Sequence, residues 1–115
     1  MLKKIRIAIL VAMFLFSVTN VFATEVKFGK YVAGDSRNDL DYGYWIELRA
    51  DQTAVLAIPG GSASGTWRYD GYKIYITIVT AYGELASERG QTVEFIHADG
   101  TGNVLYGEED AWWLQ

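Results

Sequence analysis

The chain contains no cysteine, one proline and one histidine in 115 residues, and both methionines lie within its first 13 positions. Without cysteine, the fold can use neither disulfide bonds nor thiolate metal ligands. With His97 as the only imidazole, a zinc site would lack the three or four suitable ligands that it needs. Strand or helix pairing and the packing of apolar side chains must therefore hold the fold together.

The first 23 residues have the pattern of an export signal. Three basic residues are followed by the uncharged apolar run Ile7–Phe16 and then by Val21-Phe22-Ala23, which places small residues at the −3 and −1 positions of a signal-peptidase site. An uncleaved membrane anchor is the alternative, but the apolar run is shorter than the roughly 20 residues of a membrane span. We expect cleavage after Ala23, a periplasmic or secreted protein, and no membrane association of the mature form.

The mature chain, residues 24–115, has the length of one domain. It carries seven basic and fourteen acidic residues, a formal charge of −7. Because this charge repels phosphate groups, neither nucleic acid nor an anionic membrane is an expected partner. All four tryptophans and all eight tyrosines lie in this part of the chain, so aromatic rings are expected to supply much of the core.

The clearest structural pattern lies between Tyr44 and Val79, where apolar and polar residues alternate along two consecutive hairpins. Ile46 and Leu48 share one face of a strand while Trp45 and Glu47 share the other, and Asp70-Gly71 is a typical hairpin turn. Further strands are predicted at 25–33, 92–97, 103–106 and 111–115, with loops at 34–43 and 59–64. The segment 81–91 is compatible with a short helix, a ragged strand or an excursion at one end of the sheet.

These patterns predict about eight short strands joined by short polar turns. Short connections allow only antiparallel neighbours, since a parallel crossover needs a dozen or more residues. Such a meander closes into a barrel or folds into a sandwich, and a barrel leaves no exposed edges. We therefore expect an all-β, small antiparallel up-and-down barrel, with Ile74 and Ile76 in its interior.

Two motifs resemble those of the bacterial lipocalin-like domains. The sequences WIELRADQT at 45–53 and GTWRYDGYKI at 65–74 match the family's strand, turn and hairpin pattern, and Gly29-Lys30-Tyr31 matches its opening strand. The resemblance covers nearly the whole mature chain and implies a small up-and-down barrel, in which Trp67 fills the core beside the Asp70-Gly71 turn. Tyr31 stands where lipocalins carry tryptophan, and the last strand lacks the arginine that usually stacks over that ring.

No catalytic or metal-binding constellation is evident. His97 has no motif-placed partner that would make it a general base, and we expect it at the surface, at the end of a strand. Asp35, Asp39 and Asp41 lack the ligand spacing of a calcium loop, so a solvated acidic loop is expected there. The sequence therefore predicts a protein without enzymatic activity, cofactor or metal.

The aromatic residues are the best candidates for a binding surface. If Ile46, Ile74 and Leu114 face the core, strict alternation turns Trp45, Tyr75 and Trp113 outward. Adjacent Trp112 and Trp113 cannot both point inward from a regular strand. Exposed tryptophan and tyrosine are favoured binding anchors, although such rings can also simply cover the side of a barrel or pack beneath the segment 81–91.

The leading functional hypothesis is a small exported, non-catalytic binding protein for an apolar small molecule or a protein partner. It would use the barrel mouth or the surface formed by Trp45, Tyr75 and Trp113. The alternative is a proteinaceous inhibitor or immunity factor of a secreted enzyme. In that role the carboxylates of Asp35, Asp39 and Asp41 would meet a basic target.

Overall fold

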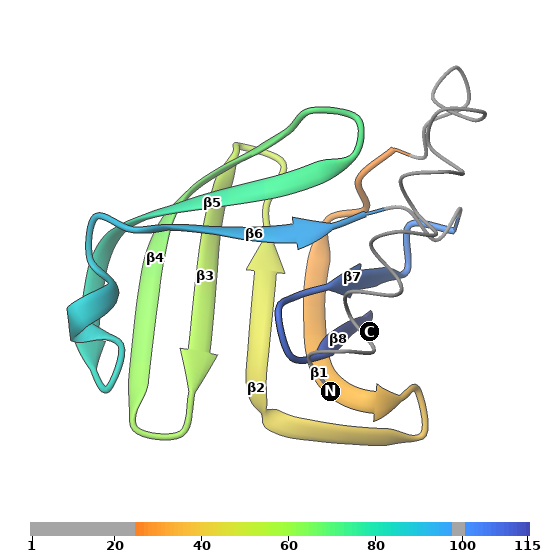
Figure 1. The fold of residues 1–115 in the computed structure, drawn as a ribbon, viewed down its shortest axis with the longest axis horizontal. Coiled ribbons are helices and arrows are strands. Elements are labelled where there is room, and N and C mark those ends of the chain that lie inside the picture. Colours follow the sequence, from red (N-terminus) through yellow and green to blue (C-terminus); the bar gives the residue numbers. More distant parts are fainter. Residues whose placement is uncertain (1–24, 98–100) are drawn as a thin grey trace.

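The computed structural model describes residues 25–97 and 101–115, which form a closed barrel of eight antiparallel strands (Figure 1). The predicted signal peptide lies outside the described residues. Each strand pairs with its neighbours in the sequence, and β1 also pairs with β8, which confirms the predicted all-β up-and-down barrel. The strands are β1 (Gly29–Ser36), β2 (Asp39–Leu48), β3 (Thr53–Ile58), β4 (Gly61–Tyr69), β5 (Lys73–Gly83), β6 (Thr92–Ile96), β7 (Val104–Tyr106) and β8 (Ala111–Leu114). No helix within these two ranges is both long and apolar enough to cross a membrane.

The barrel interior is filled by the inward side chains that alternation predicts. Ile74 and Ile76 on β5 have no exposed surface, and Ile46 and Leu48 on β2 are equally enclosed. Each such burial contributes about 1.5–3 kcal/mol. The principal core cluster consists of Tyr31, Ile46, Leu48, Ala54, Trp67, Ile74, Ile76, Phe95 and Leu105.

Trp67 fills one end of this core, as the family resemblance implies. Its indole Nε1 donates a hydrogen bond of 2.9 Å to the carbonyl oxygen of Arg49, and its backbone N–H donates one to Gln52. Both partners belong to the turn between β2 and β3. The ring also lies 6.1 Å from that of Phe28, in the segment that enters β1.

The predicted loop at 34–43 is wrong, because β1 and β2 continue through it and leave only Arg37-Asn38 as the turn. The pairing survives through shifts in register, after Val32 and again after Gly34. A side chain at Gly34 would come within 2.3 Å of the carbonyl oxygen of Asp39, so glycine allows the two strands to approach. Backbone hydrogen bonds pair the two strands through this stretch, although most of its side chains are polar. A search for alternating apolar and polar residues cannot detect such a strand.

The predicted loop at 59–64 is also mostly wrong, since only Pro59 and Gly60 connect β3 to β4. Ser62, Ala63 and Ser64 have modest strand propensity, but β3 and β5 pair with them on both sides. Tertiary pairing of this kind overrides local propensity.

The segment 81–91 combines two of its three predicted possibilities. β5 continues to Gly83, and a 3₁₀ helix, η2 (Ala86–Glu88), follows before β6. Nη2 of Arg89 donates to the carbonyl oxygen of Ala81 at 2.8 Å, and the Gly90 N–H donates to Ile78. These bonds hold the segment against the end of the barrel.

The prediction that His97 lies at the surface is wrong. The residue is 3% exposed, its Nδ1 lies 3.3 Å from the Tyr69 hydroxyl, and the two rings meet edge to face at 5.0 Å. His97 has the same strand parity as Val93 and Phe95, whose side chains point inward. It therefore continues the inner face of β6 beyond the last paired residue.

Candidate functional site: the cleft between β6 and β8

The barrel wall is weakest between β6 and β7. β6 pairs with β5 along all five of its residues, but it shares a single residue pair, Ile96 with Tyr106, with β7. Immediately after Tyr106 the chain turns back into β8, and the Gly107 N–H donates to the Asp110 carbonyl oxygen at 2.9 Å. Within the described ranges, therefore, no strand pairs with residues 92–95 on the side away from β5.

A cavity of about 610 Å³, which we name the β6–β8 cleft, occupies this gap. Its inner wall is apolar and aromatic, because Phe95 and Trp112 meet edge to face with ring centroids 6.0 Å apart. Residues from both faces of β6 line the cleft, so it follows the edge of this strand. The lining residues are Lys73, Thr92, Val93, Glu94, Phe95, Ile96, Tyr106, Gly107, Glu108, Glu109, Asp110 and Trp112.

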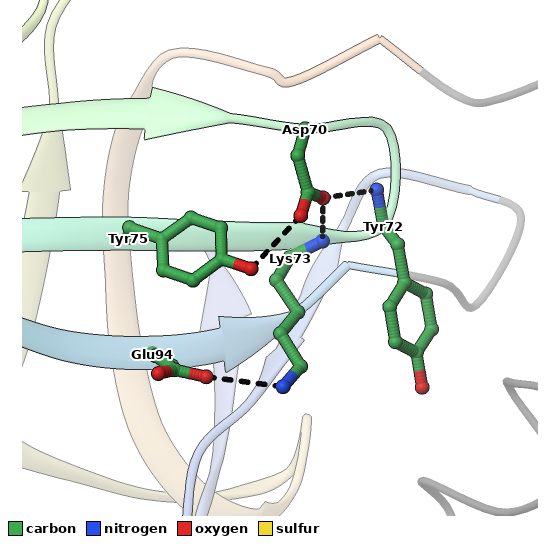
Figure 2. Close-up of polar contacts among 5 residues, drawn as sticks. All are labelled: Asp70, Tyr72, Lys73, Tyr75 and Glu94. Atoms are coloured by element: carbon green, nitrogen blue, oxygen red, sulfur yellow. Dashed lines mark hydrogen bonds and ion pairs between the residues drawn. The ribbon is translucent and has the colours of Figure 1, made fainter.

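The two rims of the cleft differ in charge balance. On the β5–β6 side, the Lys73 ammonium pairs with the Glu94 carboxylate at 3.0 Å (Figure 2). The hydrogen bond to Glu94 raises the pKa of Lys73, so this cation stays protonated. On the opposite side, residues 108–110 are three consecutive acids that form no ion pair with any described residue.

The turn beside the cleft is fixed by Asp70. Its carboxylate accepts hydrogen bonds from the backbone N–H groups of Tyr72 and Lys73, at 2.9 and 2.7 Å, and from the Tyr75 hydroxyl at 2.8 Å (Figure 2). Burial raises the pKa of Asp70, but these hydrogen bonds outweigh it and hold the pKa below its ordinary value. The ionised carboxylate thus fixes the start of β5, from which Lys73 reaches the cleft.

A second cavity of about 470 Å³, the acidic hollow, lies where the β1–β2 hairpin meets the turn before β8. Asp35, Asp39 and Asp41 line it together with Glu109 and Asp110. Burial, followed by the charges of Asp35, Glu109 and Asp41, raises the pKa of Asp110. In the part of the chain that the structure describes, no three or more histidine or acidic side chains are arranged to hold a metal ion.

The three predicted binding residues do not form one surface. Trp45 on β2 and Trp113 on β8 both lie opposite Val32 of β1, so these two rings flank the same strand. Tyr75 is on β5, three strands away from the strand of either tryptophan in the closed barrel. The structure thus brings two of the predicted residues together and separates the third.

Each of the three rings already has a cation over it. Lys30 Nζ is 4.2 Å from the Trp45 centroid, Arg37 lies over Trp113 at 5.7 Å, and Arg68 lies over Tyr75 at 4.0 Å. The Trp113 indole also donates to the carbonyl oxygen of Gly34 at 3.0 Å. These contacts favour the alternative role, in which the rings cover the side of the barrel.

Sequence reasoning did not single out the residues of the β6–β8 cleft. The available signal was a difference in strand length: the predicted strand at 92–97 is longer than that at 103–106, which a turn with three acids follows. A short strand beside a longer one leaves part of the longer edge uncovered. Trp112 was also recognisable as the inward member of the tryptophan pair once Trp113 was assigned outward.

Comparison of the chain with protein-family models, with curated proteins and with solved structures found no match. The resemblance to bacterial lipocalin-like domains therefore stays a prediction that depends on the motifs at 45–53 and 65–74. Any functional assignment must come from the geometry of the cleft and the hollow.

Proposed function

We propose that the protein is a small exported, non-catalytic binding protein whose binding site is the β6–β8 cleft. The observation that carries this proposal is an aromatic-walled cavity of about 610 Å³ in the barrel wall. Ligand sites in proteins typically have volumes of about 300–1,000 Å³ and mostly apolar linings.

The chemistry of the cleft suits an apolar group. Val93, Phe95 and Trp112 offer apolar contact, while the charged groups lie on its rims. Core side chains fill the barrel centre, so a central lipocalin-type cup is less favourable than a site in the wall. The occupant is either an apolar small molecule or an apolar side chain of a protein partner.

The surroundings of the only histidine support a role without catalysis. His97 is enclosed beside Tyr69 and lines neither the β6–β8 cleft nor the acidic hollow. A general base must reach the proton that it removes, and an imidazole that is only 3% exposed has little access to a substrate.

The test is titration of the uncharged fluorescent dye Nile red into protein purified after expression of the full chain. Dye emission should increase on binding, and Gly107→Ala should weaken binding several-fold. The added Cβ would lie 2.9 Å from Trp112 Nε1 and 3.2 Å from the Phe95 ring, inside the cleft. Gly71→Ala is the control, because its Cβ would meet nothing within 4 Å. Absence of dye binding, or equal binding by both variants, would contradict the proposed site.

A second candidate function, an inhibitor or immunity factor of a secreted enzyme, is favoured by the acidic hollow. Five carboxylates line this one depression, so a basic protein surface would gain complementary charge there. Co-purification with a basic secreted enzyme, lost in high salt and in a variant with Asp35, Asp39 and Asp41 changed to asparagine, would support it. Association that persists in high salt would remove the electrostatic basis.

A further inference from the structure

Along one edge of β6, backbone groups point into the cleft and have no partner strand among the described residues. In an antiparallel strand, the N–H and C=O of successive residues point to opposite edges. The His97 N–H donates to Tyr72, and Gln91 accepts from Ile78, so the odd-numbered residues of this strand bond to β5. The backbone groups of Thr92 and Glu94 therefore point into the β6–β8 cleft, where no described strand pairs with them.

The cleft has the form of a missing strand position. It runs beside residues 92–96, and both the inward Phe95 and the outward Glu94 line it. An extended chain rises about 3.3 Å per residue and lies about 4.8 Å from its neighbour. A segment of four or five residues would thus match the exposed edge in length.

From this geometry we propose that the β6–β8 cleft receives an extended, basic peptide segment of a protein partner, which adds a strand to the edge of β6. The inference rests on the proposed binding function and names its ligand class. The backbone of Thr92 and Glu94 would bond to the peptide, and inward peptide side chains would contact Phe95 and Trp112. Main-chain bonds supply affinity in this mode of recognition, and alternate side chains supply specificity.

The preference for basic peptides follows from charge. Glu108, Glu109 and Asp110 stand on the far rim without ion pairs among the described residues, whereas Lys73 is already paired with Glu94. Lysine or arginine side chains of the peptide would reach these acids. A second copy of this chain fits less well, because edge-to-edge pairing would bring two acidic rims together and like charges destabilise a sheet.

The probe is a fluorescein-labelled heptapeptide of alternating valine and lysine, measured by fluorescence anisotropy with the purified protein at low ionic strength. We expect saturable binding that competes with Nile red. A peptide with N-methyl groups on alternate residues loses donors to the β6 edge and should bind roughly tenfold more weakly. A valine–glutamate peptide should not bind measurably.

Two protein variants separate the backbone and charge contributions. Thr92→Pro removes a cleft-facing donor at the first position of a strand, where proline is tolerated, and should weaken the valine–lysine peptide about fivefold relative to Thr92→Ala. A variant carrying Glu108→Gln, Glu109→Gln and Asp110→Asn should remove most of the salt dependence of binding. Far-UV circular dichroism checks that each variant is folded.

The outcomes distinguish this inference from the function on which it rests. If Nile red binds the cleft but the valine–lysine peptide neither binds nor displaces it, strand addition is wrong and the cleft binds small molecules. If the N-methylated peptide binds as tightly as its parent, strand addition is also wrong. A dimer in sedimentation that Thr92→Pro dissociates would assign the β6 edge to a second copy and overturn the inference. If neither dye nor peptide binds, both proposals fail.

Discussion

Gly65 shows how closely two backbones can approach within the barrel wall. A Cβ at this position would lie 1.8 Å from the carbonyl oxygen of Thr77, at the bulge where the pairing of β4 with β5 shifts. No flexible side chain can yield there, because the obstructing atom belongs to the backbone. The absence of a side chain at residue 65 is therefore a condition for the β4–β5 pairing.

We expect Gly65→Ala to reduce the free energy of unfolding by about 3 kcal/mol or more, since the two strands must separate to admit the methyl group. Urea denaturation monitored by tryptophan fluorescence measures this loss. Gly71→Ala is the control: its Cβ has open space but a φ of +96°, so a cost of about 1–2 kcal/mol is expected. If Gly65→Ala lowered the free energy of unfolding no more than Gly71→Ala does, the close approach of the two backbones at Gly65 would be contradicted.

Asp110 carries an unfavourable charge in the folded state. Because folding raises the pKa of this carboxyl, ionising it above the unfolded value near 4 destabilises the barrel. Asp110→Asn should therefore stabilise the protein at pH 7, by about 0.3 kcal/mol after allowance for solvent screening. The gain should disappear below about pH 4, where the carboxyl is protonated in both states.

Thermal unfolding across this pH range checks the prediction. Glu25→Gln is the matched control, because Glu25 is exposed and lines neither the acidic hollow nor the β6–β8 cleft. A variant Asp110→Asn that is less stable at pH 7 would show that this carboxylate has a favourable partner in the fold.

For single residues, the sequence correctly predicted burial where it follows from the alternation of side chains along a strand, as for Ile46, Ile74 and Ile76. It did not predict the burial of His97, because residue type suggested exposure while strand parity placed the ring inside. The alternation of side chains along β6 was the better guide, because the extended backbone continues for one residue past the paired residue Ile96.

Among the elements, β6 has two unlike edges. The N–H groups of Val93, Phe95 and His97 point to β5, whereas those of Thr92 and Glu94 point into the cleft. Figure 1 shows β6 alongside β5, with the short β7 beyond it. Because one edge of β6 is covered and the other is open, the exposure of its backbone N–H groups to solvent should alternate from one residue to the next.

We expect amide hydrogen exchange along β6 to alternate. Val93 and Phe95 should exchange slowly, at rates set by opening of the β5–β6 ladder, while Thr92 and Glu94 should exchange quickly. Two-dimensional NMR after transfer into deuterated buffer measures each amide. Equal protection of Glu94 and Phe95 would show that another group covers the edge.

The sequence predicted the number and order of strands better than their ends. β2 begins at Asp39 and β4 at Gly61, in stretches whose Gly, Asp and Ser content is typical of loops. Strand pairing on either side maintains these residues in the sheet, and a single sequence carries little information about such pairing. The cleft was missed for the same reason, because an uncovered edge is defined by the lengths of two neighbours together.

In the whole molecule, the pairing of β1 with β8 closes the barrel. Four residue pairs join these strands, from Tyr31 with Leu114 to Gly34 with Ala111. Removing residues 111–115 should therefore expose both β1 and β7 and abolish cooperative unfolding. Circular dichroism during thermal denaturation measures this loss, and removal of Gln115 alone is the control. A cooperative transition in the shorter chain would show that seven strands suffice.

The pairing of the first strand with the last also governs when folding can finish. Because β8 pairs with β1, the ring of hydrogen bonds can be completed only after β8 has been synthesised and reaches β1. Until then one edge of β1 and one edge of β7 lack their partner, and the wall of the barrel stays open between them.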